Sequence, residues 1–153
     1  MIRLPARHLI GLLVLLGCGS EPDERIFGTY LLIGVDGHPL PYLVTSDANC
    51  DVHIAEGELR LNEGGTYTME FMGPLDCSRS GGPSEQDIGR QYVGSFTESG
   101  GTLQFTGPLQ GGGTLEFTGT VNPLEARVTA PPIPPDTGPD LELQFAVARV
   151  IDQ

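Results

Sequence analysis

The chain of 153 residues has the length of one ordinary domain, and its content of 39% hydrophobic and 18% charged residues is that of a chain that folds around one core. Its 22 glycines and 13 prolines predict many turns between short elements, which favours an all-β fold. All eight basic residues are arginines, and the 20 acidic residues outnumber them, so the formal net charge is −12. This balance argues against a surface that binds nucleic acid or phosphate groups.

The first 17 residues have the pattern of an export signal. Arg3 and Arg7 precede an apolar run from Leu9 to Leu16, and this part of the chain holds no acidic residue. The run is shorter than the roughly 18 to 20 residues that a membrane-spanning helix needs. It therefore predicts a signal peptide rather than a permanent span.

The apolar run ends in the sequence Leu15-Leu16-Gly17-Cys18. Here the chain resembles bacterial lipoproteins, whose lipobox has an aliphatic residue three positions before the cysteine and a small residue directly before it. The resemblance implies that cleavage follows Gly17 and that the Sγ atom of Cys18 receives a diacylglyceryl group. Residues 1–17 would then be the cleaved signal peptide, and residues 18–25 the lipidated cysteine and a short tether. An ordinary secretory signal with an incidental cysteine is the alternative.

The residue after the cysteine is Gly19 rather than Asp, which in enteric-type sorting implies transport to the outer membrane. We therefore expect a lipid-anchored protein of the cell envelope, on the periplasmic face of the outer membrane rather than at the inner membrane. Cleavage would remove Arg3 and Arg7 but no acidic residue, so the mature chain would be more acidic still. Because anionic headgroups repel such a chain, the acyl groups alone would hold it at the membrane.

With Cys18 used for the lipid, Cys50 and Cys77 remain as a pair. An exported chain enters an oxidising compartment, and we predict that the two cysteines form a disulfide. The alternative is a zinc site in which Cys50 and His53, at C-x-x-H spacing, are completed by Cys77 and His38. Only one ligand pair has useful spacing, so the disulfide is preferred.

From residue 26 onward the chain is a succession of short runs with alternating polarity, separated by glycine-rich turns, as in an antiparallel meander. The first run has apolar residues on both faces, so we expect the segment from His38 to Tyr42 to cover one of them. Residues 73–87 should form a loop tied to Cys50, and residues 131–139, rich in proline, a second loop. The expected strands are residues 26–35, 51–61 (one or two strands), 66–71, 88–97, 101–107, 113–119, 124–130 and 141–150.

Two near-copies, residues 101–107 and 113–119, each offer Leu and Phe to one face, which suits neighbouring strands of a meander. Other strands alternate in the same way. The side chains expected to point inward are large, which favours a barrel filled by its own side chains. This inward set consists of Leu59, Tyr67, Met69, Phe71, Tyr92, Phe96, Phe105, Phe117 and Phe145.

About eight strands can close into an up-and-down barrel, which removes the exposed edges of the sheet. A β-sandwich is the alternative. The layout resembles the small lipocalin-like domains of bacterial lipoproteins, through the segments Gly28-Thr29-Tyr30, Gly34 to Pro41, Gly57 to Leu61 and Gly64 to Tyr67.

The resemblance implies a single barrel domain over residues 26–153. It also implies that a late arginine, Arg149, packs over the aromatic residue of the first strand, Tyr30, as a cation–π pair. The alternative for Arg149 is that its charged end reaches solvent at the end of the strand.

The chain shows no catalytic signature, because neither His38 nor His53 is accompanied by a nucleophile elbow or an HExxH-type pair. We expect no enzyme and no cofactor. The first functional hypothesis is a binding module for a small apolar ligand. The alternative is an interaction protein, such as an envelope inhibitor or assembly factor, whose acidic loops bind a basic protein partner.

Overall fold

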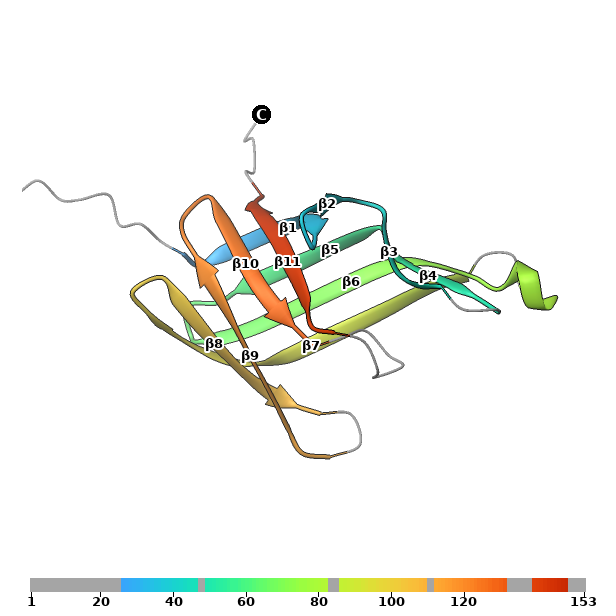
Figure 1. Ribbon diagram of the computed structural model, residues 1–153. Helices are drawn as coiled ribbons and strands as arrows, with labels where there is room; N and C mark the ends of the chain where they lie inside the picture. Colours follow the sequence, from blue (N-terminus) through green and yellow to red (C-terminus); the bar gives the residue numbers. More distant parts are fainter. Residues whose placement is uncertain (1–25, 47–48, 83–85, 110–111, 132–138, 149–153) are drawn as a thin grey trace, which may run out of the picture.

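The computed structural model describes residues 26–46, 49–82, 86–109, 112–131 and 139–148. Within these residues the chain is all-β, with one 3-10 turn as its only helical element (Figure 1). Eight strands form a closed antiparallel barrel, as predicted. They are β1 (Gly28–Val35), β5 (Glu56–Leu61), β6 (Thr66–Asp76), β7 (Gln86–Ser99), β8 (Thr102–Pro108), β9 (Thr114–Val121), β10 (Glu125–Ala130) and β11 (Leu141–Val147).

Strand β1 closes the barrel because it pairs along both of its edges. Tyr30 lies opposite Val147 of β11 on one edge and opposite Leu59 of β5 on the other. From β5 to β11, each strand pairs with the next strand in the sequence. The described strands therefore form one continuous sheet, and the alternative of a β-sandwich is wrong.

Three further strands lie outside the barrel order: β2 (His38–Pro39), β3 (Tyr42–Ser46) and β4 (Asp51–Ile54). Strand β2 folds back on β1 through a two-residue turn in which both Asp36 and Gly37 have positive φ, 50° and 76°. Positive φ at both positions is typical of the type I′ hairpin turn that an Asp-Gly pair favours.

Strands β4 and β5 run along β6 as one strand interrupted by a bulge. Val52 lies opposite Leu75, and Glu56 lies opposite Met72. An advance of four residues along β4 and β5 therefore corresponds to an advance of three residues along β6. The extra residue is at Ala55, whose backbone N–H donates a hydrogen bond to the carbonyl oxygen of Met72 (2.8 Å). The bulge explains why the sequence left open one or two strands here.

The β6–β7 hairpin extends beyond the barrel, with β3 and β4 beside it and the turn η1 (Ser78–Ser80) at its tip (Figure 1). The expected loop over residues 73–87 was therefore wrong at both ends, because pairing continues to Leu75 and Gln86. The sequence suggested a loop at Gly73 and Pro74, but the glycine is needed for packing. A Cβ atom at Gly73 would stand 2.1 Å from the carbonyl oxygen of His53.

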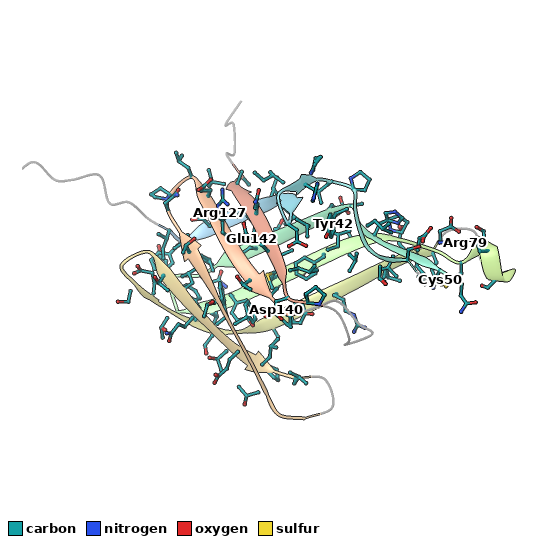
Figure 2. All side chains as sticks on the ribbon, viewed as in Figure 1. Tyr42, Cys50, Arg79, Arg127, Asp140 and Glu142 are labelled. Carbon is teal, nitrogen blue, oxygen red and sulfur yellow. A yellow bond between two sulfur atoms is a disulfide. The ribbon has the colours of Figure 1, made fainter. Side chains whose placement is uncertain are left out.

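The predicted disulfide joins Cys50 and Cys77. The two cysteines lie directly beyond the end of the β4–β6 ladder, where Asp51 is opposite Asp76. Arg79 of η1 forms an ion pair with Asp51 and donates a hydrogen bond to Ser46 (3.2 Å). Figure 2 shows Cys50 and Arg79 together at the outer end of the extension. The hydrogen bond from Ser46, followed by the charge of Arg79, lowers the pKa of Asp51.

The core lies inside the barrel, and the inward set predicted from the sequence is confirmed. Eight of its nine members are buried, and the ninth, Tyr92, is partly buried against the same cluster. Phe105 and Phe117, from the two near-copies, lie opposite each other in β8 and β9 and stack with ring centroids 4.7 Å apart. Each near-copy therefore supplies one of the two stacked rings in the aromatic core.

The outer face of β1 is not covered as expected. Leu31 and Ile33 are 48% and 54% exposed. The segment from His38 to Tyr42 instead supplies β2, which pairs with the edge of β1, while Leu40 packs against the core. An edge pairing uses backbone hydrogen bonds, so it leaves the outward side chains of β1 in solvent.

We expect the Cys50→Ser/Cys77→Ser variant to keep the barrel and to lose part of the extension. The disulfide closes a loop with a sequence separation of 27, for which chain entropy predicts a decrease in the free energy of unfolding of about 3 to 4 kcal/mol. Urea denaturation measures this decrease. Hydrogen exchange should show faster exchange in β3 and β4 and unchanged protection in β8 to β10.

The control is the wild-type chain reduced with dithiothreitol, which should behave like the double variant. An unchanged denaturation curve, or two reactive thiols in the exported wild-type protein, would contradict the structural role of this bond.

Candidate binding sites

The structure tests only part of the predicted site. Gly17, Cys18 and Arg149 lie outside the described residues, so the lipid attachment and the cation–π pair of Arg149 with Tyr30 stay predictions. Tyr30 itself is buried, and its hydroxyl donates a hydrogen bond to the carbonyl oxygen of Ile26 (2.6 Å). Burial raises the pKa of Tyr30. This side chain therefore holds the segment that precedes β1 against the end of the barrel.

The zinc alternative is wrong because Cys50 and Cys77 share a disulfide and have no free thiolate to offer. Among the described residues, no group of three or more His, Cys, Asp or Glu side chains is placed to hold a metal ion. His53 is a half-buried residue of β4.

Aromatic rings fill the interior of the barrel. Tyr67 lies edge-on to Phe105 and Phe117, with centroid distances of 4.9 and 5.7 Å. Tyr92 extends the cluster between Phe71 and Phe117 (5.8 and 6.4 Å). A small molecule could enter this part of the barrel only by displacing these rings, because protein cores are close-packed.

The hydroxyl of Tyr67 is an unusual feature of this core. The residue is 2% exposed, and its oxygen has no hydrogen-bond partner among the described residues. A Cβ atom at Gly107 would stand 3.0 Å from that oxygen, so the absence of a side chain there makes room for the phenol. Burial raises the pKa of Tyr67 to about 12.

A first candidate site is an open cleft at the end of the barrel where the chain enters β1, with a volume of about 840 Å³. We call it the end cleft. Phe96 and Val121 are buried and form its floor, and Phe27, 41% exposed, stands in its wall. In Figure 1 this end carries the β5–β6, β7–β8 and β9–β10 turns. The full lining is Ile26, Phe27, Glu63, Gly65, Phe96, Glu98, Gly101, Val121, Asn122 and Pro123.

Polar groups of the end cleft mainly hold its own turns. Glu98 accepts a hydrogen bond from the backbone N–H of Gly101 (2.6 Å). The side-chain oxygen of Asn122 accepts two, from Leu124 (2.8 Å) and Glu125 (2.9 Å). The cleft therefore offers a ligand an apolar floor under a rim that carries the charges of Glu63 and Glu98.

A second candidate site lies on the outer wall, between β1 and β5, and has a volume of about 370 Å³. We call it the wall groove. The pairing of β1 with β5 ends at Leu31 opposite Glu58, and the edge of β1 next pairs with β2 at Gly34. The two strands separate between these points, and the groove occupies the split.

The floor of the wall groove consists of Leu32, Gly57 and Phe71. A Cβ atom at Gly57 would lie 3.1 and 3.2 Å from the side chains of Leu32 and Phe71. The glycine therefore lets these two core side chains meet at the base of the groove.

Apolar and acidic side chains share the rim of the wall groove. Leu31 and Met72 are each about half exposed, at 48% and 51%. The acidic members are Glu56, Glu58 and Glu70, and the last two lie directly opposite each other in β5 and β6. Their like charges are partly offset, because Arg60 forms an ion pair with Glu58 and Gln91 donates a hydrogen bond to Glu70.

The chain matches no known family model, no curated protein and no solved structure. The described residues include no helix that is long and apolar enough to cross a membrane.

Sequence reasoning identified neither site. The end cleft is built from three turns, whose positions relative to one another depend on the closed barrel. The wall groove depends on register, which brings Leu31 beside Glu58 and Glu56 beside Met72. The one signal in the sequence is the row of apolar residues on the outer face of β1, which predicts a covered face rather than a groove.

We expect Tyr67→Phe to raise the free energy of unfolding by about 1 kcal/mol at neutral pH, because it removes a buried hydroxyl without a partner among the described residues. The phenol ionises near pH 10 in the unfolded chain but near pH 12 in the folded protein. The unfolded state therefore loses the proton first, and the stability of the wild type falls as the pH rises from about 10 to 12. The Tyr67→Phe variant should not show the part of this decrease in stability that comes from Tyr67.

Urea denaturation at pH 7 and pH 11 measures both effects. Tyr30→Phe is the matched control, because it removes a hydroxyl that donates a hydrogen bond to Ile26, and it should lower the free energy of unfolding by about 1 kcal/mol at pH 7. Loss of stability in Tyr67→Phe at pH 7 would show that its hydroxyl has a partner after all.

Proposed function

We propose that the protein is a lipid-anchored, non-catalytic binding module of the bacterial cell envelope that holds a small apolar molecule in the end cleft. The main support is the cleft itself. Its volume of about 840 Å³ is within the range of about 300 to 1,000 Å³ that is common for ligand sites, and its floor is apolar. Because aromatic rings fill the interior, the ligand binds at the end of the barrel rather than within it.

The position of the end cleft suits exchange with a membrane. Ile26 lines the cleft and stands eight residues after Cys18. Eight residues span at most about 28 Å when fully extended. A lipid on Cys18 would therefore keep the cleft close to the bilayer, where apolar molecules concentrate.

The rim restricts the class of ligand. Glu63 and Glu98 place negative charge at the cleft, and the chain as a whole carries a net charge of −12. Anionic ligands such as fatty-acid carboxylates are repelled by this field. The ligand is therefore a neutral or cationic apolar molecule.

Binding is tested with the neutral fluorescent probe N-phenyl-1-naphthylamine and the chain from residue 19 onward, which contains every described strand. The wild type should bind the probe saturably. Phe27→Glu should weaken binding by about tenfold, because it replaces an apolar contact with a charge that the probe would desolvate. Native mass spectrometry of the exported protein should show a bound mass that is lost on denaturation.

The control is Leu109→Glu, which makes the same substitution at a residue of comparable exposure, 45%, beyond the opposite end of β8. It should bind the probe as the wild type does, and circular dichroism should show that both variants fold. Equal binding by Phe27→Glu and the wild type, or no saturable binding at all, would exclude the end cleft as the site.

The lipid anchor is tested by growth with labelled palmitate. The wild-type protein should incorporate the label, and Cys18→Ser should abolish incorporation. The Cys50→Ser/Cys77→Ser variant is the control and should incorporate the label normally, because its cysteines form the disulfide. Label that persists in Cys18→Ser would overturn the proposed anchor.

A further inference from the structure

Apolar and acidic side chains meet on one face of the wall groove. Leu31 lies opposite Glu58, and Glu58 lies opposite Glu70. In the next outward row, Glu56 lies opposite Met72. Residues that are directly opposite each other in a sheet point to the same face. One molecule on the outside of the barrel can therefore contact the apolar side chains and the carboxylates together.

The base of the groove is apolar. Leu32 and Phe71 point inward and belong to the core, yet they line the groove because the wall opens there and Gly57 has no side chain. Backbone pairing of β1 continues beyond both ends of the opening, with β5 at one end and with β2 at the other. A ligand in the groove is therefore recognised by side chains rather than by free strand edges.

The volume of the groove sets the size of its ligand. At about 30 Å³ for each non-hydrogen atom, as in liquid water, a volume of about 370 Å³ holds about twelve such atoms. The outer wall of a closed barrel is convex, so a flat protein surface would contact the rim and leave the base of the groove uncovered. A small molecule can reach both.

Charge selects the class of ligand. Among the described residues that line the groove, three are glutamates and none is basic. Arg60, outside the lining, forms an ion pair with Glu58 and offsets one of these charges. Gln91 donates a hydrogen bond to Glu70 but carries no charge. The rim therefore keeps a net negative charge, which attracts a cation and repels an anion.

Apolar contact and charge can act on different parts of one ligand. Leu31 and Met72, each about half exposed, flank the apolar base, and Glu56 and Glu70 are at the same rim. We propose that the wall groove binds a small organic cation in which an apolar stem carries an ammonium or guanidinium group. The stem lies on the apolar base between the two flanking side chains, and the cationic group contacts the carboxylates.

The wall groove is independent of the end cleft, with which it shares no lining residue. The two sites also differ in what they require of a ligand, because only the wall groove needs a positive charge. The groove differs from the acidic loops expected from the sequence as well, since its carboxylates are on strands. Either site can therefore fail without the other.

Binding is tested with octylamine, which is small enough for the groove and is protonated at pH 7, as lysine is. The amide signals of the isotope-labelled chain from residue 19 onward locate even weak binding. The signals of Leu31, Gly57 and Met72 should shift saturably, while those of Gly65 and Gly101 report the end cleft separately. Octanoate should leave the groove signals unchanged. Octanol should bind there about tenfold more weakly than octylamine, because it lacks the charge.

Glu56→Gln/Glu70→Gln should weaken octylamine binding by about tenfold and leave octanol binding unchanged, because it removes two charges without changing the shape of the rim. Met72→Ser should weaken the binding of both ligands by about fivefold, because it removes apolar contact. The matched control is Asp87→Asn/Glu116→Gln, which changes the net charge equally at exposed positions outside the groove. It should bind octylamine as the wild type does.

Shifts at the end cleft without shifts at the wall groove would overturn this proposal and leave the proposed function standing. Equal weakening by the two charge variants would show attraction to the whole acidic surface only. Equal binding of octanol and octylamine would show that the groove requires no cation. Each of these results would also overturn the proposal.

Two further measurements examine other occupants of the groove. Nα-acetyl-lysine methylamide represents a lysine side chain of a partner protein. It should bind at least about tenfold more weakly than octylamine, because its stem is shorter and its amide groups would lose water; equal or tighter binding would replace the proposal by a protein partner. Sedimentation should show a monomer, and a dimer that Met72→Ser weakens would show that a second copy of the chain occupies the groove instead.

Discussion

The structure depends on the pairing of β1 along both edges. As the first strand, β1 meets the last, β11, only when the whole meander has formed, so closure uses contacts that are distant in the sequence. Its other edge pairs with two strands, because residues 28–31 pair with β5 and residues 34–35 pair with β2. The wall groove follows from this division, because β1 separates from β5 where it begins to pair with β2.

The aromatic filling and the wall of the barrel are fitted to each other. A Cβ atom at Gly94 would lie 2.0 Å from the carbonyl oxygen of Thr106, and one at Gly107 would lie 2.5 Å from that of Val93. These glycines let β7 and β8 approach closely while Tyr67 occupies the space beside them. A core filled in this way leaves no room for a ligand among the rings, and both candidate sites lie at the surfaces of the barrel.

Much of the fold could be predicted because the alternation of inward and outward side chains along a strand is visible in a short stretch of sequence. The inward positions of Tyr67, Met69 and Phe71 follow from a period of two, and the disulfide follows from the parity of the cysteines. The extension could not be predicted, because Gly73 and Pro74 resemble loop residues until β4 is beside them. The candidate sites were missed because they depend on register and on the ends of turns, which alternation does not specify.

The hydrogen bond from Tyr30 to Ile26 would have a mechanical consequence if Cys18 carries the proposed lipid. Any pull on the segment before β1 reaches the barrel at Ile26 and passes into a strand that is hydrogen-bonded on both sides. A strand at an open edge can be peeled away one bond at a time, whereas β1 can leave only by breaking two ladders together. The proposed anchor would thus pull on a part of the sheet that resists force well.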